Sequence, residues 1–288
     1  MTRADSALLS QLNANSESYR DPLAEIDWAA LSVDDYWLPP SMLSLAGLPE
    51  FEALPEATKK RLSQYEFIHF IHGGLWLERI FMERLARALR RTDSAVEYAA
   101  HLHEIREESG HSLMFLKLME RSGLHLPARA FRVPRLADFV GRHAPLDSAL
   151  FWTAVVIGEE LPDKFNRRVR GAADEINPAI ARMCMLHMID EARHIARARS
   201  MLENALQDFG ALKRRLAAPL VQRLLGQFVR TLYLPQAEIY ELAGLTPGRR
   251  WRSDARGNPA RRQFVRQCVE PTLNLLQRQG MALRLPGL

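Results

Sequence analysis

The stretch that decides the fold is HMIDEARH at positions 187–194, in which Glu191 and His194 form a Glu-x-x-His pair. A second such pair, Glu108 and His111, lies in EIREESGHSLMF at positions 104–115. Residues three apart lie on one face of a helix, so each pair presents an oxygen and a nitrogen to one point. Two such pairs on facing helices, with one carboxylate from each of two further helices, form a di-metal site in a four-helix bundle.

Two upstream glutamates stand at the spacing that this site requires. Glu78 lies 30 residues before Glu108, and Glu160 lies 31 residues before Glu191. In two antiparallel helices joined by a loop, such equal offsets place both pairs at the same height in the bundle. Adjacent helix positions differ by about 100°, so only one of Glu159 and Glu160 points inward. We predict Glu160, with Glu159 as the alternative.

Three neighbouring residues extend the pattern. Glu107 and Asp190 each precede a predicted ligand glutamate, where a carboxylate can accept the free ring N–H of a ligand histidine and fix its tautomer. His187 lies four residues before Glu191 on the same helical stripe, which predicts a third imidazole ligand. The alternative is a buried histidine bonded to a backbone carbonyl. Ligands of this mixed oxygen and nitrogen type suit iron or manganese.

A third Glu-x-x-His pair, Glu66 with His69, has no carboxylate at comparable spacing. We interpret it as ordinary helix surface or as packing beside the site.

The rest of the chain indicates an all-α fold. No segment alternates polar and β-branched residues as a strand does. Residues 1–56 contain several prolines and predict an irregular N-terminal arm packed on the bundle, whereas residues 57–288 predict a single helical domain, a four-helix bundle with additional C-terminal helices. The predicted helices span residues 59–92, 95–121, 147–171, 177–209, 212–234, 237–242 and 260–279, with caps at Asp93-Ser94 and Asp147 and loops at 124–146 and 244–260.

Composition excludes several classes of protein. Of 288 residues, 47% are hydrophobic and 25% charged, which excludes a mostly disordered chain. Two cysteines, Cys184 and Cys268, exclude a disulfide framework. No apolar run reaches the roughly 18 residues of a transmembrane helix. The first residues, MTRADSALLSQ, lack the apolar core of a signal peptide, so we expect a cytoplasmic protein with no membrane partner.

The net charge of +5 arises from the segment that follows Lys213, which includes GRRWRSDARGNPARRQ at positions 248–263. Such a tract suits phosphates, an anionic substrate or an acidic protein. We do not expect nucleic acid, because the tract does not interleave aromatic and basic residues as a reading surface.

The metal-ligand pattern resembles the ferritin-like di-iron oxygenases. Within them, His-x-x-x-Glu-x-x-His in HMIDEARH is similar to the p-aminobenzoate N-oxygenase family, and IYELAGL at positions 239–245 resembles its C-terminal portion. The resemblance implies a ligand set of three histidines and four carboxylates, here Glu78, Glu108, His111, Glu160, His187, Glu191 and His194.

The resemblance also implies an activity. Two iron ions, with manganese as a possible substitute, would activate O2 and oxidise an amine to a hydroxylamine, nitroso or nitro product in a biosynthetic pathway. The amine would be free or bound to an acidic carrier protein, and arginines such as Arg249, Arg250 and Arg252 would bind a substrate carboxylate or that carrier. Electrons would come from a separate reductase, since no nucleotide-binding motif occurs here. Bundles of this type commonly form homodimers.

Two other readings use the same ligands. One is a di-iron hydroxylase or desaturase that acts on the carbon of an acyl or alkyl substrate, and the other is a non-catalytic iron-binding bundle. His187 distinguishes the N-oxygenase, because the carbon-oxidising enzymes lack this ligand.

Overall fold

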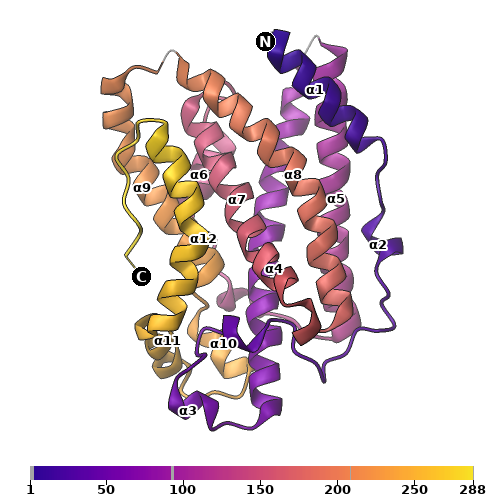
Figure 1. Ribbon diagram of the computed structural model, residues 1–288, viewed down its shortest axis with the longest axis vertical. Coiled ribbons are helices and arrows are strands. Elements are labelled where there is room, and N and C mark those ends of the chain that lie inside the picture. Colours follow the sequence, from indigo (N-terminus) through magenta and orange to yellow (C-terminus); the bar gives the residue numbers. More distant parts are fainter. Residues whose placement is uncertain (1–2, 92–93, 208, 288) are drawn as a thin grey trace.

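The computed structural model describes residues 3–91, 94–207 and 209–287, and within these ranges every regular element is helical. This confirms the predicted all-α class. Four long helices form the bundle (Figure 1): α4 (Glu56–Ala88), α5 (Ala95–Ser122), α7 (Ala149–Gly171) and α8 (Pro178–Gln207). Chain direction alternates between α4 and α5 and between α7 and α8, and each of these two pairs makes extensive contact. The bundle therefore consists of two helical hairpins.

The remaining elements surround this bundle. Their bounds are α1 (Arg3–Ser16), α2 (Pro22–Glu25), η1 (Pro40–Met42), α3 (Pro49–Glu52), η2 (Ala128–Ala130), α6 (Arg135–His143), η3 (Ala173–Glu175), α9 (Ala211–Tyr233), α10 (Ala237–Leu242), α11 (Gly248–Gly257) and α12 (Pro259–Arg278). Helix α1 packs on α5 and α8, whereas α9 and α12 pack on α7.

Local chemistry sets the helix ends that position the bundle. The Ser94 side chain accepts a hydrogen bond from the backbone N–H of Glu97 at the start of α5, and Gly123 ends that helix with a left-handed φ of 66°. Ser148, one residue beyond the predicted Asp147, caps α7 through the N–H of Phe151. Of the other predicted boundary residues, Thr92 and Asp93 lie outside the described residues.

Three helices occur where the sequence predicted irregular chain. Helix α1 contains no proline or glycine and buries Leu9. Helix α6 has no side-chain cap of its own, but Gln227 of α9 accepts hydrogen bonds from the backbone N–H groups of Leu136 and Ala137. Helix α11 buries Trp251 and Ala255, which lie one turn apart. Tertiary contacts stabilise each helix, so local sequence gives a weak signal for them.

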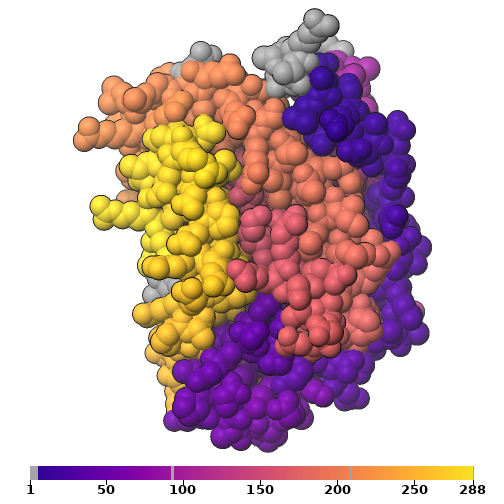
Figure 2. All heavy atoms as spheres, in the orientation of Figure 1, coloured from indigo at the N-terminus to yellow at the C-terminus, as the bar shows by residue number. Residues whose placement is uncertain are grey.

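The Glu66-x-x-His69 pair lies in the interior, not on the helix surface. Ser44 of the N-terminal arm donates its backbone N–H and its hydroxyl to the Glu66 carboxylate. The hydroxyl of Tyr240 lies 2.9 Å from Ser44 Oγ, and the Asn258 amide donates to the carbonyl of Ser44. This network joins the arm to the C-terminal helices at the lower end of the molecule, where Figure 2 shows them side by side.

No helix in the described part of the chain combines the length and the apolar character that crossing a membrane would need.

We predict that Gly248→Ala destabilises the fold. A Cβ atom at this position would lie 2.2 Å from the backbone oxygen of Ala237, and backbone cannot yield as a side chain does. Overpacking of this kind costs about 1–3 kcal/mol. The matched control is Gly257→Ala at the other end of α11, where the same Cβ meets nothing within 4 Å. Thermal denaturation of both variants checks this, and equal melting temperatures would contradict it.

Candidate metal centre

Seven buried acidic and imidazole side chains meet inside the bundle. They form two groups, in each of which one ligand-type atom per residue lies within 4.8 Å of the others. The first group is Glu78, His111 and His187, and the second is Glu108, Glu159, Glu191 and His194. Helices α4 and α7 each supply one glutamate, α5 supplies a glutamate and a histidine, and α8 supplies the remaining three residues.

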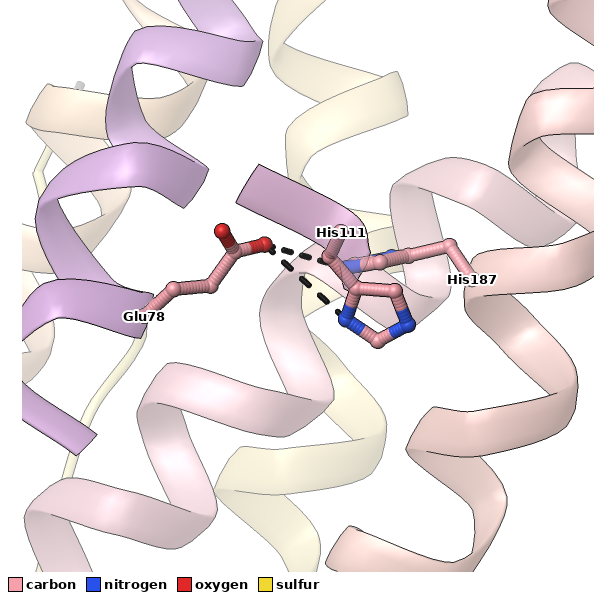
Figure 3. Close-up of side chains that lie close together, drawn as sticks. All are labelled: Glu78, His111 and His187. Atoms are coloured by element: carbon pink, nitrogen blue, oxygen red, sulfur yellow. Dashed lines mark ion pairs between the residues drawn. The ribbon is translucent and has the colours of Figure 1, made fainter. Parts of the chain in front are cut away.

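In the first group, Glu78 faces two imidazoles (Figure 3). Its Oε1 lies 4.0 Å from His111 Nδ1 and 3.7 Å from His187 Nε2. The other oxygen of Glu78 accepts a hydrogen bond from the Ser112 hydroxyl, which orients the carboxylate. The three side chains come from three helices and converge on one point.

Glu108 and Glu191 lie between the two groups. His194 Nδ1 is 3.1 Å from Glu108 Oε1 and 3.9 Å from Glu191 Oε1. His111 Nδ1 is 3.8 Å from Glu108 Oε2 and 3.9 Å from the same oxygen of Glu191. Each of these carboxylates therefore approaches a histidine of both groups, so either could help to hold a cation in each group.

The structure brings Glu159, not the predicted Glu160, into the cluster. Glu160 is fully buried, but its carboxylate accepts hydrogen bonds from Arg199 Nε at 2.7 Å and from the Thr272 hydroxyl at 2.6 Å. Thr272 lies on α12, more than 100 residues along the chain. The spacing of 31 residues was consistent with either glutamate, and the partners that take Glu160 away from the centre are set by tertiary packing.

Glu107 and Asp190 hold the histidines crosswise. Glu107 of α5 accepts a hydrogen bond from Nε2 of His194 on α8 at 2.9 Å, and Asp190 of α8 accepts one from Nε2 of His111 on α5 at 3.1 Å. Each histidine thus turns Nδ1 toward the cluster. Arg193 bonds to both acids and balances their charge.

His187 has a partner that the sequence analysis missed. Its Nδ1 lies 2.7 Å from the amide nitrogen of Asn166, while its Nε2 lies 3.2 Å from Glu191 Oε1. With the amide turned so that its oxygen accepts from Nδ1–H, Nε2 is free to bind a cation. Asn166 follows Glu159 by seven residues, two helical turns on the same face, and this spacing was the available signal.

Crowding of the acids sets the electrostatics of the site. Burial and the charge of Glu108 raise the pKa of Glu78 to about 8, and burial raises the pKa of Glu159 to about 8. Burial and the adjacent Glu159 raise the pKa of Glu191 well above its ordinary value. Burial acts the same way on Glu108, but the adjacent His111 and His194 imidazoles outweigh it and lower its pKa. Bound cations would replace the protons that these acids hold.

The donor set fits a pair of divalent cations. Buried Glu78 Oε1, His111 Nδ1 and Glu191 Oε2 have no hydrogen-bond partner among the described residues, and these atoms belong to residues of the cluster. Buried polar atoms are rarely left unpaired, so their convergence indicates a missing positive charge. Carboxylate oxygens and imidazole nitrogens, with no thiolate, suit iron or manganese.

The predicted basic tract lies away from this centre. Its arginines belong largely to α11, at the lower end of the molecule in Figure 1. There Arg250 pairs with Glu50 and with Asp254.

A helical bundle that encloses such a cluster defines the class of ferritin-like di-metal proteins. Residues 2–280 match the model of the p-aminobenzoate N-oxygenase AurF family, and the chain belongs to this family.

One solved structure shares the fold, and two mycobacterial proteins share part of the sequence. An R2-like ligand-binding oxidase with a reconstituted Mn/Fe cofactor has a TM-score of 0.51 and 14% identity, over 98% of this chain and 94% of its own. Uncharacterized proteins of Mycobacterium bovis and Mycobacterium tuberculosis are 27% identical over 218 residues, 71% of this chain. The match spans 63% of the length of these relatives.

We predict that Glu159→Gln lowers the metal content, whereas Glu160→Gln leaves it unchanged. Glu159 offers a carboxylate oxygen to the cluster, while both oxygens of Glu160 are held by Arg199 and Thr272. Elemental analysis should give about two metal ions per chain for wild type and Glu160→Gln, and about one or fewer for Glu159→Gln. A lower metal content in Glu160→Gln than in Glu159→Gln would instead support Glu160 as the ligand, as the sequence analysis predicted.

Metal loading should weaken as the pH falls. The raised pKa values of Glu78, Glu159 and Glu191 mean that these groups hold protons in the metal-free protein near neutral pH. Cations must displace these protons, so acid favours the metal-free state. Equilibrium dialysis against Fe²⁺ under anaerobic conditions, between pH 8.5 and 6, would measure this. Affinity that is independent of pH would contradict it.

Proposed function

We propose that the protein is an O2-dependent di-iron N-oxygenase that oxidises an amine to a hydroxylamine and further to a nitroso or nitro product. Membership of the N-oxygenase family supports this proposal. The observation that carries it is the position of His187, whose Nε2 lies with Glu78 and His111 in the first group. This third imidazole is the feature that, by the resemblance, separates an N-oxygenase from di-iron enzymes that oxidise carbon.

Two iron ions would be held by Glu78, Glu108, His111, Glu159, His187, Glu191 and His194, with manganese as a possible substitute. When bound, this pair supplies the reduction of O2 and the transfer of one oxygen atom. For the first oxidation, amine, O2, two electrons and two protons give hydroxylamine and water. The two electrons would come from a separate reductase.

The chain's own residues orient and shield the centre. Glu107 and Asp190 keep the Nδ1 atoms of His194 and His111 directed inward, and Arg193 offsets their charge. The cluster side chains are at most 5% exposed, so bulk water is kept away from the reacting groups.

Further parts of the proposal concern partners and place in the cell. We expect a cytoplasmic enzyme of a biosynthetic pathway that acts on a small amine, either free or held by a carrier protein. A homodimer is also expected, and the half-exposed Leu102, Leu113 and Leu116 of α5 offer apolar surface for it.

Replacement of His187 tests the N-oxygenase. His187→Ala removes one imidazole from the first group but leaves the other six groups, so the protein should retain at least about one iron per chain. Oxidation of 4-aminobenzoate with O2 and a chemical reductant should fall by about tenfold or more, a loss of the size that a misplaced metal site produces. The matched control is His125→Ala, an exposed histidine outside the cluster.

Three outcomes would count against this function. Wild-type protein that binds less than about half an iron, and no manganese, would have a structural carboxylate cluster. Full iron without any oxidation would favour the iron-binding bundle. Hydroxylation of a carbon atom, with nitrogen untouched, would favour the hydroxylase.

A further inference from the structure

A cavity of about 310 Å³ opens at the end of the bundle where α4 and α8 end and α5 and α7 begin. Each of the four helices that supplies the cluster also lines this cavity. The lining residues nearest the cluster are Phe81, Glu104, Val155 and Arg197. They lie three or four residues from Glu78, Glu108, Glu159 and His194 respectively.

This spacing places the floor of the cavity close to the metal centre. Three or four residues are one helical turn, about 5 Å along each helix axis. On all four helices the lining residue lies toward the same end of the bundle, because chain direction reverses within each of the two hairpins. The cluster residues do not themselves line the cavity, and its floor lies about one helical turn from them. Its size is at the lower end of the range for small-molecule sites.

The wall of the cavity carries buried N–H groups without partners. Among the described residues, three N–H groups that line the cavity have no hydrogen-bond partner: Trp152 Nε1, Arg197 Nε and Arg84 Nε. These three residues are 8%, 5% and 7% exposed. The ring atom Nδ1 of His101, which also lines the cavity, is a fourth buried polar atom without a partner. The other nitrogens of Arg84 donate to the backbone oxygens of Arg142 and Ala144, and Arg197 pairs with Glu104, which fixes both guanidinium groups.

The three unpaired N–H groups are donors, so a ligand that satisfies them must carry an acceptor atom. An unpaired buried donor is costly, and a carbonyl oxygen in this place would remove that cost. The wall also contains apolar and aromatic side chains, and Phe81, Phe151 and Val155 are available to contact a flat ligand.

Charge in the cavity is balanced. Among its described lining residues, three arginines (Arg84, Arg91 and Arg197) face three acids (Glu97, Glu104 and Asp147). Burial and the charge of Arg197 lower the pKa of His101, which also lines the cavity, to about 4, so this imidazole is neutral. With no net charge to offset, the cavity favours a neutral ligand over an anion.

We propose that this cavity is the substrate pocket and that it selects a neutral aromatic amine bearing a carbonyl-type acceptor, which Trp152 Nε1–H and Arg197 Nε–H bind. That the bound amine is a substrate rests on the proposed function. The pocket itself, and its preference for a neutral ligand with an acceptor atom, can be measured by binding alone. Trp152 is a binding residue here, with no part in holding the metal.

Binding of 4-aminobenzamide, 4-methylaniline and 4-aminobenzoate to the metal-loaded protein tests the acceptor. Calorimetry should show the amide binding most tightly, because it alone is neutral and carries a carbonyl oxygen. Trp152→Phe keeps a ring but removes the N–H. It should weaken amide binding about 3- to 10-fold, as expected for one hydrogen bond, and leave 4-methylaniline unchanged. Unchanged amide binding in this variant, or tighter binding of the benzoate than of the amide, would overturn the proposal.

A second variant fills the cavity. Val155→Phe places a ring at its floor and should weaken binding of both neutral ligands more than tenfold, while iron per chain stays at the wild-type value. The matched control is Val133→Phe, the same change at a residue that is 42% exposed and does not line the cavity. Equal binding by the two variants would overturn the pocket. If the amide binds as predicted but no amine is ever oxidised, the pocket stands as a binding site and the N-oxygenase function fails.

Discussion

The structure depends on the repulsion among four glutamates buried at one point. Glu78, Glu108, Glu159 and Glu191 share the interior with three imidazoles, and their negative charges are tolerated there only with protons or cations bound. Neighbouring residues of the bundle hold the imidazoles that face these glutamates. Glu107 and Asp190 accept crosswise hydrogen bonds from the histidines of the opposite helix, which tie α5 to α8 and turn the Nδ1 atoms of these histidines toward the cluster. The stability of the fold, the affinity for metal ions and the protonation of the glutamates therefore depend on one another in this protein.

The surroundings of the centre differ between its two sides. On the outer side of α5, the N-terminal arm passes so close to Gly110 that a Cβ there would lie 2.3 Å from the hydroxyl of Tyr19. The Arg106 guanidinium stacks on the same tyrosine ring, so the arm covers the helix between Glu108 and His111. At the α4–α8 end, in contrast, a cavity with unpaired donors approaches the cluster. One side is thus covered by the arm, whereas the other has the cavity that we propose as a binding site. Control of access to a reactive metal centre requires both.

The position of His187 gives the centre its asymmetry. The first group contains two histidines and one carboxylate, and the second contains one histidine and three carboxylates, of which Glu108 and Glu191 also approach His111 of the first group. Asn166 fixes the ring of His187 from behind, as Glu107 and Asp190 fix the other two, but with a neutral amide in place of a carboxylate. A neutral partner donates less charge to the ring than a carboxylate does, so the third imidazole is held in place as a weaker base. Two cations in such a site would have unequal surroundings.

The sequence by itself determined the all-α class, the four long helices and six of the seven clustered residues, because helical periodicity converts a three-residue spacing into a shared face and equal offsets into equal height. It also predicted acids beside the ligands, though not that each would reach across to the other hairpin. Only the tertiary structure decided between Glu159 and Glu160, since Arg199 and Thr272 of distant segments hold the second glutamate. It also decided that α6 forms, through a cap from Gln227, and that Glu66 is buried against Ser44. These outcomes depend on contacts between residues far apart in the chain, and local spacing carries no information about such contacts.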